Sequence, residues 1–348
     1  MPVPDAISRL RLGVSANLDD GGSIHRATFE RAVRMAAADA GRSADDFIWE
    51  SDRANPEGGA RASRRLVEAG VGAVVGHYAS GAAWAALPAY REAGIAMLLP
   101  AATADELVTP DGVAFRFCPP DRELAAAIAD DLRGAHAAAS LALRSDGSVH
   151  GDAVTKLLAA EAARRGIAVL DDTAGVAGAA GAEALFFAGL FGPSAAFVRE
   201  RRAAGDRRPI LLADDALHAA LPGEVGSDAG NVTVYGFATP EGTAEAIPEA
   251  ADLLARYRDI HGEPAGIYFL ETYAAMRVAI EAIEGAPSRR AVLDRLAGST
   301  WRTVLGPLDL ARREAAPIRY LAWAVEQGRL LPVRECRHMV GTGSGDRE

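Results

Sequence analysis

The sequence predicts an α/β protein with two lobes, each built on a central parallel β-sheet. The chain has 348 residues, which is long for one compact unit. Short apolar runs alternate with amphipathic stretches along it, and this alternation is typical of βαβ units. Hydrophobic residues make up 49% of the sequence, which is enough apolar material to form real cores.

The first series of elements occupies the N-terminal third of the chain. The apolar runs predict strands at 11–16, 47–51, 71–75, 95–99 and 115–117. The amphipathic runs predict helices at 24–40, 60–69 and 82–93. Ligands of open parallel sheets lie beyond the carboxyl ends of the strands. The loops after Ser15, Val75 and Leu99 are therefore candidates to line a cleft.

A second series follows and ends in a longer helical region. We expect strands at 138–143, 167–170, 184–188, 210–212, 232–235, 301–310 and 319–325. We expect helices at 123–133, 153–165, 194–204, 249–261, 268–284 and 291–297. Residues 341–348 form a polar tail that we expect to be disordered. By the same strand-end rule, the loops after Leu143, Ala188 and Leu212 are further candidates for a cleft.

Composition excludes several classes of partner. Acidic residues outnumber basic ones by 47 to 37, giving a net charge of −10, whereas nucleic acids and anionic membranes require a basic face. The sequence holds no apolar run of about 18 residues, so we expect no membrane insertion. Cys118 and Cys336 lie far apart, and the seven histidines show no metal-ligand spacing. We therefore expect no metal, no disulfide framework and no cofactor.

Motifs for catalysis are missing from the sequence. There is no Gly-x-Ser-x-Gly elbow, no Gly-x-Gly-x-x-Gly fingerprint and no phosphate-binding Gly-Lys-Ser/Thr loop. His77 and Ser80 are close in sequence, but the pattern places no orienting acid beside them. We therefore expect a binding protein with no catalytic residues.

The segment 74–107 carries the most informative pattern. It predicts a strand, a loop with Ser80, a helix, a second strand and a loop of small residues that ends in Thr103. Two such loops on adjacent strand ends offer hydroxyls and backbone N–H groups that suit a carboxylate. Alternatively, Ser80 and Thr103 only cap helices. The sequence leaves both interpretations open.

Motifs along nearly the whole chain together resemble one known family. They are Phe29-Glu-Arg-Ala-Val33, Asp52-Arg-Ala-Asn-Pro56, Gly76-His-Tyr-Ala-Ser80, Pro100-Ala-Ala-Thr103, Gly306-Pro-Leu308 and the segments 146–151, 189–202 and 268–275. The chain resembles the branched-chain amino-acid-binding proteins of ABC importers, which have the class I periplasmic-binding-protein-like fold. The resemblance implies two Rossmann-like lobes, residues 1–118 with 239–312 and residues 119–238 with 313–348. Three hinge crossings near 117–121, 236–240 and 310–319 would join them, with the ligand between the lobes.

The resemblance also implies a site for an amino acid. Ser80, Ala101 and Thr103 match the residues that bind the α-carboxylate, and Ala79 and Ala102 flank them. Asp214 matches an acid that binds the α-ammonium, with Asp215 as a close second candidate. The family has Glu at that position, so the shorter Asp changes the reach. Without the resemblance, a solvated Asp-Asp turn would be the preferred interpretation.

The pocket for the ligand side chain departs from the family pattern. The matching positions hold Ile24, Tyr78, His150 and Phe191, and Leu270 also belongs to the expected site. His150 stands where the family has tyrosine, and a simple surface histidine is an equal alternative. Leucine, isoleucine or valine therefore does not follow as the ligand.

The compartment is inferred from two further differences. Family members often join the second βα loop to the Ser-bearing loop by a disulfide, and the matching positions here are Ala54 and Ala79. The first residues also show no secretory signal. We expect a cytoplasmic protein, or a periplasmic one if the chain was trimmed. The expected function is capture of an amino acid or close analogue for an ABC permease. A cytosolic sensor coupled to a transcriptional regulator or a biosynthetic pathway is the alternative, and an enzyme on this fold ranks third.

Overall fold

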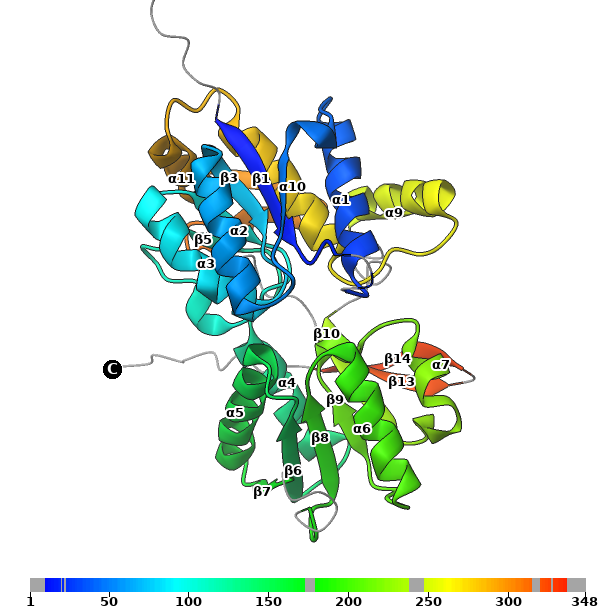
Figure 1. The fold of residues 1–348 in the computed structure, drawn as a ribbon. Helices are drawn as coiled ribbons and strands as arrows, with labels where there is room; N and C mark the ends of the chain where they lie inside the picture. Colours follow the sequence, from blue (N-terminus) through cyan, green and yellow to red (C-terminus); the bar gives the residue numbers. More distant parts are fainter. Residues whose placement is uncertain are drawn as a thin grey trace, which may run out of the picture. The chain divides into compact units, whose positions relative to one another are not determined.

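The computed structural model describes residues 10–19, 21, 23–172, 179–237, 247–314, 320–326 and 328–336. The chain forms two compact units (Figure 1). Unit 1 comprises Met1–Pro120 and Ala238–Ile318, and unit 2 comprises Asp121–Phe237 and Arg319–Glu348. Each unit has a sheet flanked by helices, which confirms the α/β prediction. The predicted tail 341–348 and parts of two predicted crossings, 238–240 and 315–319, lie outside the described residues.

Unit 1 is built around a five-stranded, fully parallel sheet with the order β2-β1-β3-β4-β5. Its strands are β1 (Arg11–Ala16), β2 (Ile48–Ser51), β3 (Val71–Gly76), β4 (Ala96–Leu99) and β5 (Ala114–Arg116). Its helices are α1 (Arg26–Asp39), α2 (Pro56–Glu68), α3 (Ser80–Ala93), α9 (Pro248–His261), α10 (Phe269–Ile283) and α11 (Arg289–Gly298), with short 3-10 helices η1 (Ala44–Asp46) and η2 (Asp105–Leu107).

Both faces of this sheet are buried, which explains the continuous apolar runs of its strands. Ala73 and Val75 of β3 point into a core shared with α1, α9 and α10. Val74, between them, points into a second core with α2 and α3. Side chains of a strand alternate between the two faces, so each run fills both cores.

Helix α2 begins four residues before the predicted start. Asn55 accepts a hydrogen bond from the backbone N–H of Gly58 at 2.8 Å, and Pro56 occupies the first turn. Asn as an N-cap followed by Pro is a strong helix start. Gly58 and Gly59 lower helix propensity, but their small size is needed, because a Cβ on either would overlap a backbone carbonyl of Asp52 or Ala82.

Unit 2 has a seven-stranded sheet with the order β14-β13-β10-β9-β8-β6-β7. Its strands are β6 (Ser140–Ser145), β7 (Ala168–Asp171), β8 (Ala184–Ala188), β9 (Ile210–Leu212), β10 (Val232–Phe237), β13 (Tyr320–Glu326) and β14 (Arg329–Cys336). Its helices are α4 (Asp121–Gly134), α5 (Val149–Arg164), α6 (Phe191–Ala203) and α7 (Leu221–Val225), with 3-10 helices η3 (Asp214–Ala216) and η4 (Gly226–Ala229).

The structure differs from the predicted strands and helices in four details. The single strand predicted at 301–310 is a hairpin of β11 (Thr300–Thr303) and β12 (Gly306–Asp309), with Val304 and Leu305 at the turn. The sheet of unit 2 is not wholly parallel, because β13 and β14 pair antiparallel at one edge. Strand β14 was missed because it contains Pro332 and charged residues, which are typical of edge strands. The short helix α7 was missed as well.

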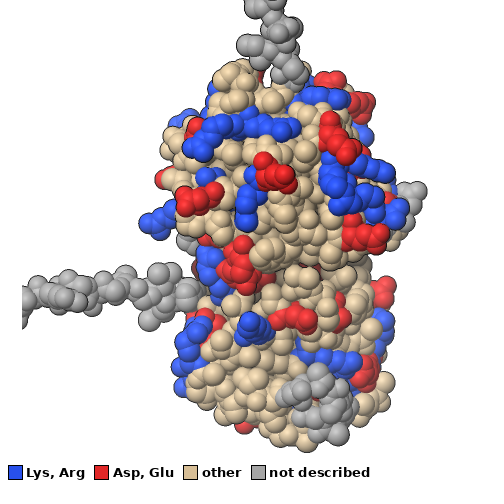
Figure 2. All heavy atoms as spheres, turned by 60° about the vertical axis from the view of Figure 1, so that its left-hand side comes forward, with Lys and Arg blue, Asp and Glu red and all other residues tan. Residues whose placement is uncertain are grey.

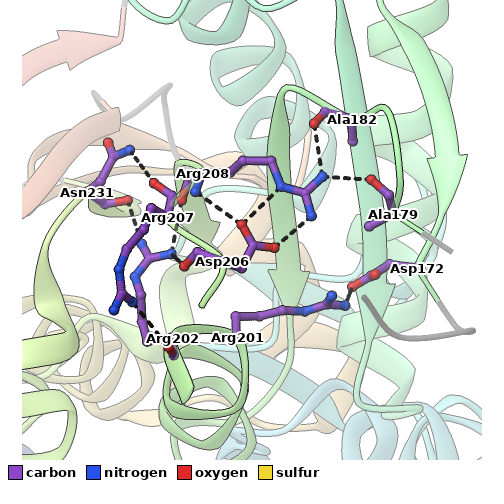
Figure 3. A network of polar contacts seen from close by, with 9 residues as sticks. All are labelled: Asp172, Ala179, Ala182, Arg201, Arg202, Asp206, Arg207, Arg208 and Asn231. Atoms are coloured by element: carbon purple, nitrogen blue, oxygen red, sulfur yellow. Dashed lines mark hydrogen bonds and ion pairs between the residues drawn. The ribbon is translucent and has the colours of Figure 1, made fainter. Parts of the chain in front are cut away.

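Arginines fix the connection between α6 and β9 (Figure 3). Arg208 donates to the carbonyls of Ala179 at 2.6 Å and Ala182 at 2.9 Å, and it pairs with Asp206 at 2.6 Å. Arg202 donates to the carbonyl of Gly230 at 2.7 Å. These bonds hold the amino end of β9 in place. The carboxyl end of the same short strand leads directly to Asp214.

Charged side chains of both signs are interspersed over the face drawn in Figure 2. Several ion pairs of the protein are largely exposed, such as Arg290–Asp294 and Arg34–Asp45. Exposed pairs of this kind contribute little to stability. The charged side chains that bear on a binding site are the buried ones.

Candidate functional site

The strand order of unit 1 reverses between β1 and β3, because β1 connects to β2 on one side and β3 to β4 on the other. Loops at such a reversal are the usual ligand site of an open parallel sheet. The loop after β3 carries residues 77–79 and enters α3 at Ser80. The loop after β4 carries Ala101, Ala102 and Thr103. The predicted carboxylate residues therefore lie at the favoured edge of the sheet.

Ser80 and Thr103 lie on neighbouring loops that touch. Both side chains are 4% exposed, and the Ser80 Oγ atom accepts a hydrogen bond from the backbone N–H of Ala104 at 3.4 Å. Ser80 is the first residue of α3, and the N-cap is Ala79. The N-cap of η2 is Ala104 rather than Thr103. The interpretation of these two residues as N-caps is therefore wrong.

A buried arginine supports the loop that carries Thr103. The Arg116 side chain is 0% exposed and donates to the carbonyl of Thr103 through Nη1. Its Nη2 donates to the carbonyls of Ala104 at 2.7 Å and Asp105 at 3.2 Å. Its Nε lies 3.7 Å from Oε1 of Glu314. A guanidinium therefore lies directly beneath the small-residue loop, and its charge favours an anion there.

The remaining predicted residues of unit 1 have different surroundings. The Tyr78 hydroxyl lies 2.8 Å from Thr272 Oγ1 in α10, so it is held by a hydrogen bond. Ala79 is half-buried, and Ile24 is exposed just before α1. Leu270 is 1% exposed within the apolar core of unit 1, so its role there is packing.

His77 joins the loop after β3 to the loop after β2. Its Nδ1 lies 2.7 Å from Asp52 Oδ2 and 3.1 Å from Ser15 Oγ, and its Nε2 lies 3.1 Å from the Tyr90 hydroxyl. In a nucleophile–base relay the serine and the acid contact different ring nitrogens, whereas here both contact Nδ1. The contacts of His77 with Asp52, Ser15 and Tyr90 therefore have a structural role. They connect the two loops that carry Ala54 and Ala79.

Gly76 allows His77 to approach β1 so closely. Its φ of 127° lies in a region that L residues rarely adopt. A Cβ at this position would lie 1.9 Å from the carbonyl oxygen of Ser15. Only glycine fits between β3 and β1 here.

In unit 2 the strand order reverses between β6 and β8. Asp146 joins the loops after these two strands, because Oδ1 accepts from Ser148 N at 2.9 Å and Oδ2 from Leu190 N at 2.8 Å. A Cβ on Gly189 would lie 2.6 Å from Asp146 Cγ, so glycine is required there. Ser148 then caps α5 by accepting from Gly151 N at 3.0 Å. The first turn of α5, which contains His150, is therefore held firmly at the carboxyl edge.

His150 lies between two aspartates. Its Nε2 is 3.1 Å from Asp214 Oδ1, and its Nδ1 is 3.3 Å from Asp121 Oδ1. Asp214 is 2% exposed, so it is not part of a solvated Asp-Asp turn. His150 is buried as well, so the interpretation as a surface histidine is also wrong. The structure thus brings together two predicted site residues, with Asp121 as a third member.

The charges of this cluster depend on one another. Burial alone would lower the pKa of the His150 imidazole, but the charges and hydrogen bonds of Asp121 and Asp214 outweigh it and raise this pKa well above the ordinary value. The side chain of Asp215 is half-buried beside the cluster. Burial raises the pKa of its carboxyl to about 7, and Asp214, Asp121 and Asp146 act in the same direction against His150.

The ring of Phe191 packs against that of His218. Phe191 begins α6, and its ring centroid is 5.5 Å from that of His218 in an edge-to-face arrangement. It belongs to the same edge of the unit 2 sheet, because α6 follows β8.

Sequence reasoning missed Arg116, Asp121 and Asp146. Arg116 stands between two aromatic residues in a short strand, and a charge in such a buried run is a signal for a partner. Asp121 opens a helix, where an acid is ordinary, so nothing in the sequence marked it as special. Asp146 lies in a polar loop of a common type. Its role depends on Leu190, which is distant in sequence.

Three further properties hold for the described residues. None of their helices is long and apolar enough to cross a membrane. No group of three or more His, Cys, Asp and Glu side chains is arranged there to hold a metal ion. Cys118 and Cys336 are both buried, and no disulfide joins them.

Solved structures share this fold at low sequence identity. A leucine-binding protein of Thermotoga maritima has a TM-score of 0.83 and 18% identity, covering 94% of this chain and 98% of its own. A branched-chain amino acid transporter substrate-binding protein of Streptococcus pneumoniae, in complex with isoleucine, has a TM-score of 0.76 and 20% identity, covering 93% and 98%. A solute-binding protein of R. palustris in complex with benzoate has a TM-score of 0.78 and 13% identity, covering 94% and 96%.

Sequence comparison agrees with the fold. A search of curated proteins finds no match to this chain. The family model described as periplasmic binding protein, in contrast, matches residues 10–326, which is most of the sequence. The match includes every site residue discussed above and all strands of the two sheets except β14. The chain belongs to the periplasmic-binding-protein family.

Proposed function

We propose that this protein is a non-enzymatic substrate-binding protein of an ABC importer, which captures an amino acid or a close analogue by its carboxylate. The observation that carries the proposal is the pair of touching loops with Ser80 and Thr103, supported from beneath by Arg116. Hydroxyls, backbone N–H groups at the start of α3 and a buried guanidinium together favour an anionic group. The ligands named for the three neighbours above, leucine, isoleucine and benzoate, all carry a carboxylate.

The first experiment identifies the ligand. A thermal-shift screen against amino acids, their des-amino acids, amides and aromatic acids should find compounds that raise the melting temperature, because a ligand of the folded state stabilises it. Carboxylates should give shifts, and their amides should not. A screen in which only uncharged compounds bind would contradict the carboxylate assignment.

The second experiment tests the loops. Ser80→Ala and Thr103→Ala should each weaken binding of the best carboxylate by about 1–2 kcal/mol in calorimetry, the usual range for one hydrogen bond to a charged group. Ser288→Ala is a matched control, because Ser288 caps α11 in the same unit and its hydroxyl accepts a hydrogen bond from Ala291 N. Unchanged affinity in both loop variants would remove the site assignment.

A cytosolic sensor remains the second candidate function. Ala54 and Ala79 favour it, because the disulfide that the resemblance implies cannot form there. The Asp52–His77 contact connects the same loops without covalent chemistry. Uptake of the identified compound by vesicles that contain the neighbouring permease would support transport. Capture of a transcriptional regulator only in the presence of that compound would support sensing.

A further inference from the structure

The protons of the buried cluster around His77 can be assigned from its hydrogen bonds. The side chains of this cluster are all 0% exposed, namely Ser15, Asp52, His77 and Tyr90. The Ser15 hydroxyl donates its one proton to the carbonyl of Glu50 at 3.0 Å, so its oxygen can only accept from His77 Nδ1 at 3.1 Å. Asp52 Oδ2 lies 2.7 Å from the same nitrogen, and an ionised carboxylate also only accepts. Nδ1 of His77 therefore carries a proton.

The other ring nitrogen of His77 faces a hydroxyl. Its Nε2 lies 3.1 Å from the Tyr90 hydroxyl, which has His77 as its hydrogen-bond partner in the described part of the chain. Burial and the charges of Asp52 and Glu50 raise the pKa of Tyr90 well above its ordinary value, so the hydroxyl keeps its proton. If Nε2 carried a proton as well, it would donate to the Tyr90 oxygen, and the buried hydroxyl proton would lack an acceptor. The ring is therefore neutral, and Tyr90 donates to Nε2.

These hydrogen bonds hold His77 from three elements of unit 1. Ser15 belongs to β1, Asp52 directly follows β2, and Tyr90 lies within α3. Asp52 is itself fixed, because its Oδ1 accepts from the backbone N–H of Ala54 at 2.9 Å. Breaking any of these bonds leaves a buried polar group without its partner, which is unfavourable. We therefore expect the ring of His77 to keep one orientation.

His77 also begins the loop that leads to Ser80. Residues 78–79 alone separate the two in the chain. The Tyr78 hydroxyl is held from α10 by a hydrogen bond at 2.8 Å, and the Ser80 Oγ atom accepts from Ala104 N at 3.4 Å. Each part of the loop is thus fixed by a contact with another element. A binding loop that is already ordered avoids the entropic cost of being ordered by the ligand.

We propose that His77 is a positioning residue of the carboxylate site, whose neutral ring, protonated on Nδ1, holds the loop of Ser80 in its binding conformation before a ligand is present. This inference rests on the proposed function and deepens it, because it assigns part of the affinity to a side chain that is 0% exposed and acts through the loop. The donor at Nδ1 matters most, since its contact with Asp52 is the shortest of the three. Asn can place an amide N–H near the position of Nδ1, whereas Leu offers no donor.

The first test locates the ring proton without any ligand. Long-range proton–nitrogen NMR spectra of the full-length protein at about pH 7 should show a histidine ring with a single proton, on Nδ1. This signal belongs to His77 if it is absent from His77→Asn. A His77 ring with its proton on Nε2, or with both nitrogens protonated, would overturn the proposal.

The second test follows the loops by hydrogen exchange in the ligand-free protein. In His77→Leu the backbone amides of residues 77–83 and 101–105 should exchange about tenfold faster than in the wild type, and His77→Asn should restore most of the protection. Tyr90→Phe removes a single hydrogen bond and replaces His77→Leu if that variant does not fold. It should speed exchange over the same residues about threefold. Unchanged exchange in the folded variants would overturn the proposal.

The third test measures affinity by calorimetry, well below the melting temperature of each variant, with benzoate and L-leucine as probes. His77→Leu should weaken binding of the probe that the wild type binds by about tenfold, and His77→Asn by about threefold or less. A residue with a purely structural role would lower the melting temperature and leave the affinity of the folded protein unchanged. That result would contradict the positioning role.

A matched control separates the loop from general stability. Trp301 is 6% exposed on β11 and donates from Nε1 to the carbonyl of Leu296 at 3.2 Å, outside both loops. Trp301→Phe should therefore lower the melting temperature but change neither the exchange of the loops nor the affinity. If neither probe binds the wild type, the proposed function fails for both probes. The NMR and exchange tests then still decide whether His77 fixes the loop.

Discussion

Unit 1 and unit 2 repeat one architecture but hold buried charges in different ways at the carboxyl ends of their strands. In unit 1 the buried cation Arg116 donates to three backbone carbonyls and lies 3.7 Å from the carboxylate of Glu314, so it fixes a loop. In unit 2 the buried imidazole of His150 lies between two carboxylates, which raise its pKa against the effect of burial. Topology decides where a site forms, and a few buried side chains decide which charge it accepts.

The largest effect is expected for Arg116→Met. Its loss leaves the carbonyls of Thr103, Ala104 and Asp105 without their donor in a buried setting and removes the partner of Glu314. The free energy of unfolding should fall by about 3–5 kcal/mol. Chemical denaturation checks this. The control is Arg53→Met, which breaks an exposed pair with Asp19 and should cost no more than about 0.5 kcal/mol.

A second prediction concerns Glu271, a buried acid of unit 1, and contrasts it with the aspartates that contact His150 in unit 2. Burial raises the pKa of Glu271, which is 4% exposed in α10, to about 8. The unfolded chain ionises this group near pH 4.3, so the folded state binds the extra proton between about pH 4.3 and 8 and loses stability as the pH rises. From about pH 5 to 7 this loss amounts to about 2–3 kcal/mol.

Glu271→Gln should remove that slope in denaturation curves recorded at several pH values. Glu281→Gln is the matched control, because Glu281 lies on the same helix and pairs at the surface with Arg277. If both variants keep the wild-type slope, Glu271 is already ionised in the folded protein. The comparison with the paired aspartates of unit 2 would then fail.

The smallest predicted effect on stability concerns two serines at the starts of helices. Ser148 is the N-cap of α5 and holds the turn that carries His150, so Ser148→Ala should destabilise unit 2 by about 1 kcal/mol. Ser80 is the first residue of α3 rather than its cap, so Ser80→Ala should change stability by about 0.5 kcal/mol or less. Thermal unfolding checks both. Equal losses would mean that the two serines have the same structural role.

The sequence predicted most of the fold because apolar runs and amphipathic periods are local signals. Strands β1, β8 and β9 have the predicted bounds. Two bounds were predicted wrongly because a cap or a turn outweighs the apolar pattern. Asn55 and Pro56 start α2 earlier than predicted, despite two glycines in its first turns. A two-residue turn divides residues 301–310 into a hairpin. Edge strand β14 lacks the apolar pattern of a central strand.

The candidate site was predictable only through loops that the strand-end rule selects. Ser80, Thr103, His150 and Asp214 lie in such loops, so resemblance and topology suggested them together. Their partners depend on the tertiary structure. Arg116 reaches a loop on a neighbouring strand, and Asp121 approaches His150 from another helix. Leu270, which was also predicted to bind ligand, is buried in the core of unit 1.

Helix α10 is synthesised long after the strands of unit 1 that it covers. It packs against β1 and β3, yet the first strands of unit 2 precede it in sequence. At a synthesis rate of about 5–20 residues per second, roughly ten to thirty seconds separate synthesis of β5 from completion of α10. During that interval the apolar face of β1 and β3 lacks its final cover. Ribosome-associated chaperones are expected to occupy this face, and slowing translation between β5 and α10 should increase aggregation of the nascent protein.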